Sequence, residues 1–373
     1  MIDARFIRNV LLKALGLFII LNLLYMALDP LSWLGRISAY NLLLPGRERL
    51  PFGENPAKSY NLSLYNLDAM FASHKLAGAA KPSGEYRVLL VGDSSVWGIL
   101  LRPEETLASQ LNTGPLPTTC TGQSIRVYNL GYPTISLTKD LMLLDQVRRY
   151  EPDLIVWLTT LEAFPRDKQL ASPVVANNPQ RVRDLIARYK LQFDPHDSAL
   201  AQTNGWSRTI IGQRRALADL LRLQFYGVLW GATGIDQEYP ADYPPAQRDL
   251  DPDPTFHGWQ PPTLDSSLLA LDVLQAGMQA AGQVPILLVN EPILVSTGAN
   301  SDIRYNFFYP RWAYDQYRQL LTDLSQQQGW SYLDLWDVVP QSQFTNSAIH
   351  LTPLGESMLM RVLSKTIQYE SCR

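Results

Sequence analysis

The sequence has few residues of the kinds that bind metals or nucleic acids. It contains two cysteines and four histidines in 373 residues, and they form no cluster with metal-ligand spacing, so we expect no metal and no other cofactor. The net charge of −3 argues against nucleic acid as a partner. Cys120 and Cys372 can either pair outside the cytoplasm or remain two buried thiols, and the sequence leaves both open.

Charged residues are also scarce near the amino terminus, where residues 10–28 form an apolar run that Lys13 interrupts. As a helix this run spans about 28 Å, close to the hydrocarbon thickness of a bilayer. Arg5 and Arg8 precede it, which places the amino terminus in the cytoplasm and the bulk of the chain outside. A cleaved signal peptide is the main alternative, but no small-x-small cleavage pattern follows the run. We therefore expect a cytoplasmic tip and an uncleaved single-pass anchor in residues 1–30.

The rest of the chain is expected to form an irregular connector, residues 31–82, and one domain, residues 83–373. Within the domain, short apolar runs alternate with amphipathic helical patterns. This alternation predicts a five-stranded parallel sheet with helices on both faces, a three-layer α/β/α sandwich. The strands are expected at residues 87–91, 125–129, 154–158, 284–290 and 331–335.

The connection between the third and fourth strands is much longer than a usual loop of this type and predicts an insertion at about residues 163–282. Helices are expected within it at residues 181–191 and 206–229. The second helix is unusually apolar in its later half. It fits a lid over the site, a membrane-surface helix, a docking face or a buried helix of an inserted subdomain, and the sequence leaves these open.

The first strand ends abruptly in Gly92-Asp93-Ser94. Ligands of open α/β sheets bind at the carboxyl ends of strands, and a serine placed there can act as a nucleophile when a base reaches it. Asp93 is expected to bond backbone N–H groups and is a candidate substrate contact. His350, just before a helix start at Thr352 and Pro353, is the candidate base.

Gly131 follows the second strand in the same way that Gly92 follows the first. Taken in order, these blocks resemble the GDSL/SGNH hydrolase family over residues 86–160 and 283–368. The resemblance implies a flavodoxin-like fold with Ser94 as the nucleophile (Ser95 is a weaker alternative) and His350 as the general base. It also implies that the Ser94 and Gly131 N–H groups form the oxyanion hole.

Two positions depart from the pattern of that family. Leu161 stands where the family has the asparagine that donates to the oxyanion, so Thr160 or its neighbour Thr159 is the candidate donor. Ser347 stands where the family has the aspartate that supports the histidine. The adjacent Asn346 can hold the imidazole by its carbonyl oxygen, and Asp334 or Asp337 is the alternative partner.

Three further residues are candidate substrate contacts: Glu162, Glu291 and Arg304. Asn290-Glu291-Pro292 resembles the acid/base strand of many retaining glycosidases, but too little chain follows it to complete a (β/α)₈ barrel. Glu291 is therefore expected at the rim of the same cleft, as a substrate contact or a hydrogen-bonded structural carboxylate. Arg304 opens an aromatic- and arginine-rich stretch suited to sugar rings or to a protein partner.

The sequence thus predicts a membrane-anchored esterase or O-acyltransferase that acts outside the cytoplasm on an acylated cell-surface glycan. The architecture resembles proteins that work beside a multi-span membrane acyltransferase. The alternative is a catalytically inactive subunit that keeps the fold and serves as a docking or structural component of a membrane complex.

Overall fold

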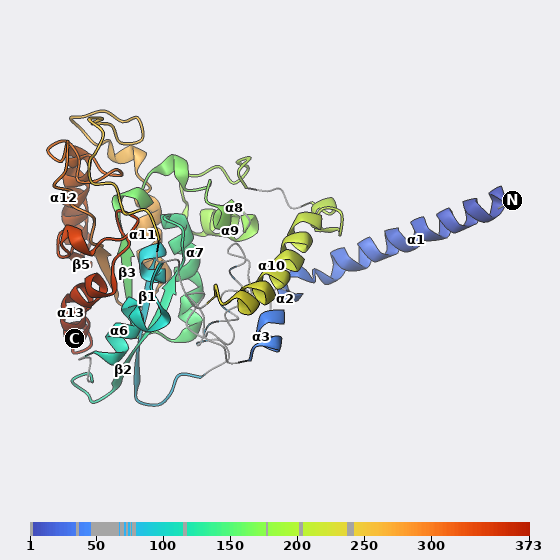
Figure 1. Ribbon diagram of the computed structural model, residues 1–373, viewed down its shortest axis with the longest axis horizontal. Helices are drawn as coiled ribbons and strands as arrows, with labels where there is room; N and C mark the ends of the chain where they lie inside the picture. Colours follow the sequence, from blue (N-terminus) through green and yellow to red (C-terminus); the bar gives the residue numbers. More distant parts are fainter. Residues whose placement is uncertain are drawn as a thin grey trace.

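The computed structural model describes residues 3–34, 37–45, 80–114, 118–176, 178–200, 204–236 and 242–373, together with Leu67, Phe71, His74 and Leu76. An α/β body carries the amino-terminal helix α1 (Ala4–Leu28), which projects away from it (Figure 1). Much of the expected connector, residues 31–82, lies outside the described residues. Its described part contains the short helices α2 (Leu31–Leu34) and α3 (Ala39–Leu43).

Five parallel strands form one sheet in the order β2-β1-β3-β4-β5. The sheet confirms the expected fold class, with β1, β3 and β4 in the interior and β2 and β5 at the edges. Its strands are β1 (Glu85–Gly92), β2 (Ser124–Gly131), β3 (Leu154–Thr159), β4 (Ile286–Asn290) and β5 (Ser331–Asp334).

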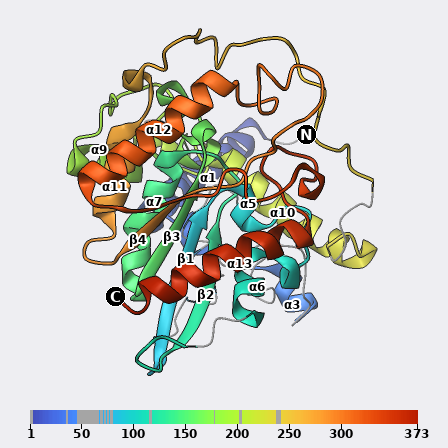
Figure 2. The same ribbon diagram turned by 90° about the vertical axis from the view of Figure 1, so that its left-hand side faces the viewer.

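The alternation of side chains along β1 supplies two separate cores. Val88 and Leu90 belong to the core shared with α6 (Leu107–Thr113) and α13 (Pro353–Glu370). Leu89 and Val91 belong to the other core, with α7 (Leu137–Val147), α11 (Leu271–Ala280) and α12 (Arg311–Gln328). Successive strand residues point to opposite faces, so one apolar strand serves both layers. Figure 2 shows α13 lying across the strands.

Polar caps fix where the layer helices begin. The Ser136 hydroxyl accepts from the Lys139 N–H at the start of α7, and the Thr352 hydroxyl accepts from the Gly355 N–H at the start of α13. Shorter pieces connect the layers: α5 (Ser94–Trp97), α8 (Pro173–Ala176) and 3-10 turns at Pro103–Glu105, Arg148–Tyr150, Leu161–Ala163, Arg166–Lys168, Trp206–Arg208, Ser266–Leu268 and Gln341–Gln343.

The chain between β3 and β4 contains both helices expected there, with shifted bounds: α9 (Pro179–Tyr189) and α10 (Arg214–Thr233). The second begins later than expected because residues 206–208 form a separate 3-10 turn. A fully buried α10 is ruled out, because Leu221, Phe225 and Leu229 on it are exposed.

Helix α1 covers the expected apolar run and extends it back to Ala4. It is long and apolar enough to span a bilayer, and nearly all of it is exposed. This helix fits a single-pass anchor.

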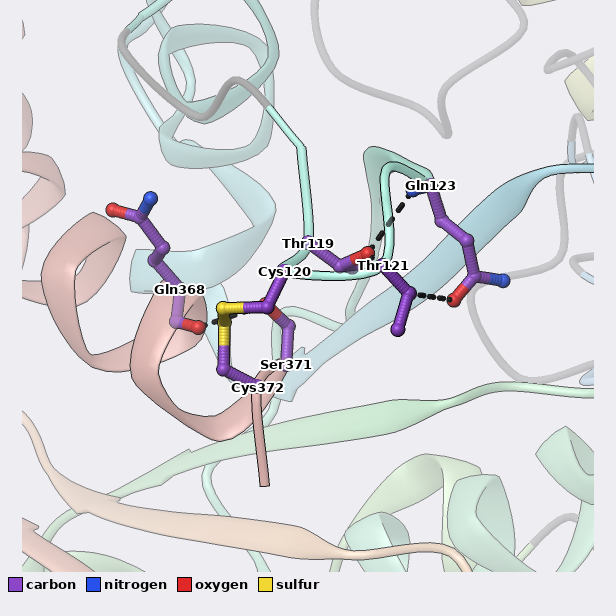
Figure 3. The surroundings of a disulfide bond; sticks show 7 residues. All are labelled: Thr119, Cys120, Thr121, Gln123, Gln368, Ser371 and Cys372. Carbon is purple, nitrogen blue, oxygen red and sulfur yellow. Dashed lines mark hydrogen bonds between the residues drawn. A yellow bond between two sulfur atoms is a disulfide. The ribbon is translucent and has the colours of Figure 1, made fainter.

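The two cysteines are paired. Cys120 lies in the loop before β2, and Cys372 follows the end of α13 (Figure 3). Their Cα atoms are 5.3 Å apart, and the bond joins positions 252 residues apart in the sequence. Of the two possibilities that the sequence left open, the structure contains the disulfide.

Candidate active site

The turn after β1 presents Ser94 at the carboxyl edge of the sheet. Asp93 caps the short helix α5 by accepting a hydrogen bond from the Ser95 N–H (2.8 Å), and Ser94 is the first residue of that helix. A Cβ on Gly92 would lie 2.5 Å from Val96 Cγ2, so only glycine lets the helix pack this closely on the strand.

His350 reaches this serine from the other end of the chain. The Ser94 Oγ and the His350 Nε2 lie 2.8 Å apart across 256 sequence positions. Backbone contacts hold the segment that carries His350, because the Thr345 N–H donates to the His350 carbonyl (2.9 Å) and Phe344 forms an antiparallel β-bridge with Leu351. The structure therefore brings together the two residues that the sequence proposed as nucleophile and base.

Asn346 holds the other side of the imidazole, with its Oδ1 2.8 Å from the His350 Nδ1. An amide oxygen only accepts, so this contact assigns the ring proton to Nδ1 and leaves the Nε2 lone pair facing the serine hydroxyl. The alternative partner Asp334 is engaged elsewhere, by the Asn290 amide (2.8 Å) and by the Arg318 guanidinium (2.8 Å). Asp337, the other alternative, is exposed.

Burial lowers the pKa of His350 below its usual 6.5, and the nearby Asp93 carboxylate opposes that shift. The imidazole is therefore neutral near pH 7, which is the form that accepts a proton. Asp93 also supplies negative charge close to the ring, which favours the imidazolium formed during proton transfer.

A buried ion pair supports the nucleophile turn from behind. The Lys139 Nζ donates to the Gly92 carbonyl (2.6 Å) and pairs with Asp140 (2.5 Å), whose other oxygen accepts from the Trp157 indole (3.1 Å). Lys139 is fully buried. Sequence analysis missed this pair, and the signal that could have revealed it is adjacent charges among the apolar residues of α7.

Glu291 lies beneath the turn. It is 2% exposed and accepts a hydrogen bond from the Ser95 hydroxyl. It is therefore buried below the rim where it was expected, and of the two roles left open this contact fits the hydrogen-bonded structural carboxylate. Burial, reinforced by the neighbouring Asp93, raises the pKa of Glu291 well above its usual value. Since the Ser95 hydroxyl is directed at Glu291, Ser94 is the better-placed nucleophile.

The expected oxyanion donors are only partly in place. Gly131 pairs with Gly92 in the sheet register, but its N–H donates to the Asn129 Oδ1 (2.8 Å). The Thr160 hydroxyl is fully buried against the Tyr309 hydroxyl (2.9 Å), so it does not face the serine. The Ser94 N–H belongs to the first turn of α5, where backbone donors have no intrahelical acceptor.

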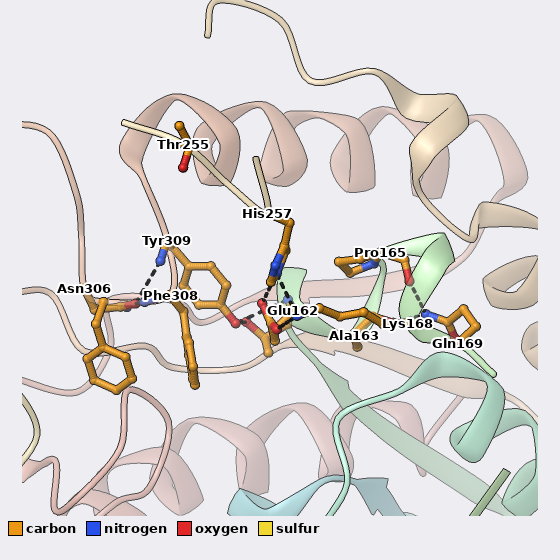
Figure 4. Close-up of polar contacts among 12 residues, drawn as sticks. Glu162, Ala163, Pro165, Lys168, Gln169, Thr255, His257, Asn306, Phe308 and Tyr309 are labelled. Carbon is orange, nitrogen blue, oxygen red and sulfur yellow. Dashed lines mark hydrogen bonds and ion pairs between the residues drawn. The ribbon is translucent and has the colours of Figure 1, made fainter. Parts of the chain in front are cut away.

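Two further expected contacts are occupied within the protein. Glu162 pairs with Lys168 (2.5 Å) and with His257 (2.8 Å), as Figure 4 shows. Burial works to raise the pKa of Glu162, but hydrogen bonds from these two partners bring it below its usual value. Lys168 is partly exposed, so this cluster lies near the surface.

Arg304 is a structural residue, contrary to the expected substrate contact. It is 7% exposed, and its guanidinium donates to five backbone carbonyls. These belong to Asp253, Thr255, Asn306, Phe307 and Phe308. The side chain therefore ties the loop before α12 to residues 253–255.

No protein-family model matches the sequence, and no curated protein matches it. Solved structures with a similar fold include a GDSL-like lipase from Bacteroides ovatus (10% identity, TM-score 0.36), over 76% of this chain and 53% of that one. This chain thus spans about half the length of the Bacteroides protein. A second is a carbohydrate acetylesterase family member from Sinorhizobium meliloti, with 15% identity and a TM-score of 0.34 over 76% of this chain and 98% of that one. A third is a catalytic mutant of an acetylxylan esterase from Geobacillus stearothermophilus, with 12% identity and a TM-score of 0.37 over 77% of this chain and 96% of that one.

Proposed function

We propose that this chain is a serine esterase whose nucleophile is Ser94 and whose general base is His350. The observation that carries the proposal is the contact between the Ser94 Oγ and the His350 Nε2 (2.8 Å), together with the orienting contact from Asn346 (2.8 Å). A nucleophile, a base and a group that orients the base are the parts that acyl transfer requires.

The arrangement supports a two-step reaction. His350 takes the proton of the Ser94 hydroxyl as Oγ bonds to the ester carbonyl carbon, and it returns that proton to the leaving alcohol. A water molecule or a second hydroxyl then gives its proton to His350 as its oxygen bonds to the acyl carbonyl carbon. The bond from that carbon to the Ser94 Oγ breaks, and His350 returns the proton to Oγ. The Ser94 N–H stabilises the oxyanion, and Gly131 adds a second donor when the Asn129 side chain turns away.

The proposal extends to location and substrate. Helix α1 anchors the chain, and the basic residues Arg5 and Arg8 before it favour a cytoplasmic amino terminus with the α/β body outside the cytoplasm. The Cys120–Cys372 disulfide suits an oxidising compartment. An enzyme held at this surface is placed to remove or transfer acyl groups on a cell-surface glycan, beside a multi-span acyltransferase as partner.

One set of observations favours a second candidate, an inactive subunit that keeps the fold. The Gly131 N–H is engaged by Asn129, Thr160 is turned to Tyr309, and Leu161 is buried in the core. In a serine protease, the loss of one oxyanion donor costs about 3–4 kcal/mol of transition-state stabilisation. A loss of that size is enough to silence a weak esterase.

A fluorophosphonate probe separates the two candidates. Full-length protein in detergent should become labelled, and Ser94→Ala should abolish the labelling. Ser95→Ala is the matched control and should still be labelled, because Ser94 remains in place. If the unaltered protein is not labelled and does not hydrolyse p-nitrophenyl acetate, the inactive subunit is the better description. Labelling that survives Ser94→Ala would reject Ser94 as the nucleophile.

A further inference from the structure

Helix α10 exposes apolar side chains on a face that is normally polar when a helix faces water. Leu221, Phe225 and Leu229 are 61%, 70% and 56% exposed. Their spacing of four residues places them on one side of the helix. A contiguous exposed apolar stripe of this kind marks an interaction site.

A different side of α10 packs on the segment that follows α1. The Gln224 Oε1 accepts the Ala39 N–H (2.7 Å) at the start of α3. A Cβ on Gly231 would lie 2.2 Å from Leu44 Cδ1, so the two segments pack in close contact. The apolar stripe is therefore held outward by packing on the other side.

This part of the molecule lies beside the end of α1 (Figure 1). The Arg208 guanidinium lies 3.8 Å from the carboxylate of Asp29, the residue that follows the end of α1, and a Cβ on Gly205 would lie 3.5 Å from the Met26 sulfur. Outside α1, most described large apolar side chains that are exposed belong to residues 33–43 and 206–235, and the exceptions are Tyr243, Leu354 and Tyr369. The exposed apolar surface is thus concentrated where the anchor would leave the bilayer.

Arginine and aromatic side chains accompany the stripe. Arg214, Arg215 and Arg222 are exposed on α10, and the Arg222 guanidinium lies 6.0 Å from the ring centroid of Tyr226, which stacks on Trp230. Apolar residues on one side with arginine and aromatic rings nearby are characteristic of helices that lie in the membrane interface. Arg222 pairs with Asp219 on the same helix (2.7 Å), whereas Arg214 and Arg215 suit anionic headgroups, which attract basic side chains.

We propose that α10 lies in the surface of the bilayer that α1 spans, with Leu221, Phe225 and Leu229 inserted among the lipids. The inference rests on the anchoring role of α1 in the proposed function and is independent of the esterase chemistry. It gives the insertion between β3 and β4 a second membrane contact. Two contacts restrict rotation of the α/β body about α1, which a single-pass helix alone does not.

Spin labels on the full chain in lipid vesicles test the proposal. Leu221→Cys and Phe225→Cys carry the label on the stripe, Leu354→Cys is the matched exposed leucine on α13, and Leu15→Cys reports on α1. The vesicles contain phosphatidylethanolamine and phosphatidylglycerol, with phosphatidylcholine alone as a second set. Collisions with oxygen report lipid exposure, and collisions with a water-soluble nickel complex report water exposure.

We expect the labels at positions 221 and 225 to resemble that at position 15, accessible to oxygen and shielded from nickel several-fold more than the label at position 354. Labels at 221 and 225 that match position 354 would overturn the proposal while leaving the anchor intact. Shielding from both reagents would also overturn it, because another copy of the protein would then cover the stripe. A water-exposed label at position 15 would instead reject the anchor. Weaker insertion in phosphatidylcholine would support the role of the arginines.

Discussion

Helices α7 and α10 both carry apolar faces, but the face of α7 is buried and that of α10 is exposed. On α7 the apolar residues Leu141 and Leu144 are fully buried, and so is the charged Lys139. On α10 Leu221 and Phe225 remain exposed while the other side of the helix packs on the anchor segment. The α/β body buries its apolar surface within the protein, whereas α10 leaves such a surface exposed, and this is the surface that we propose enters a bilayer. Helical periodicity alone does not distinguish these two outcomes.

The largest expected difference between the regions is in catalysis. His350→Ala should lower kcat/KM for p-nitrophenyl acetate by about 10⁴-fold or more, because the serine loses its base. Leu229→Ala on α10 should leave kcat/KM for this water-soluble ester within about twofold, since such a surface change carries little energy. Steady-state kinetics of the full chain in detergent measures both. If Leu229→Ala lowered kcat/KM as much as His350→Ala, α10 would contribute to catalysis, and the two regions would not be functionally separate.

The next largest difference concerns ion pairs. Lys139→Met removes one partner of the buried pair with Asp140 and should cost about 3–5 kcal/mol in the free energy of unfolding, because Asp140 is left buried without its counter-charge. Arg222→Met is the control. It breaks the exposed pair with Asp219 (2.7 Å) and should cost less than about 1 kcal/mol. Denaturant unfolding followed by tryptophan fluorescence gives both values, and equal losses would contradict the comparison.

A matched leucine pair sharpens the comparison further. Leu141→Ala in the body should cost about 2–5 kcal/mol of unfolding free energy, through lost burial and the cavity that remains. Leu221→Ala on α10 should cost about 0.5 kcal/mol or less in detergent, because that side chain is 61% exposed. A large loss for Leu221→Ala would mean that a protein surface covers the stripe.

The features of this structure that depend on residues adjacent in the sequence could be predicted. The strand that ends at Gly92, the cap at Thr352 and the apolar run of α1 each follow from neighbouring residues. The pairing of Ser94 with His350 was predicted from the resemblance of their sequence blocks to the GDSL/SGNH family, and the structure places the two side chains in contact. The sequence also indicates locally that Ser94 lies at the carboxyl edge of the sheet, where ligands of such folds bind.

The errors concern side chains whose partners come from distant segments. The Thr160 hydroxyl was expected to face the oxyanion, but Tyr309 takes it. Arg304 was expected to meet substrate, but loop carbonyls saturate its donors. Glu291 turned inward because Ser95 offers it a hydroxyl. In each case at least one hydrogen bond joins the side chain to a residue far away in the sequence, and local spacing carries no record of that bond.

The smallest predicted effect concerns the influence of residue 346 on the pKa of His350. Because burial depresses the pKa of His350 below 6.5, kcat/KM should rise with pH along an acid limb whose midpoint lies below 6.5, and should level off above it. Asn346→Asp places a carboxylate against the Nδ1–H and favours the imidazolium, so the midpoint should move to higher pH by about one unit or more.

The pH profile of kcat/KM for the unaltered protein and for Asn346→Asp measures this shift. Asn346→Ala is the control, and it should lower kcat/KM at the plateau without the upward move, since it removes the orienting oxygen and adds no charge. Leu221→Ala on α10 should leave the midpoint where it is. If the midpoint of the acid limb is unchanged in Asn346→Asp, a group other than His350 titrates. His350 would then not be the general base.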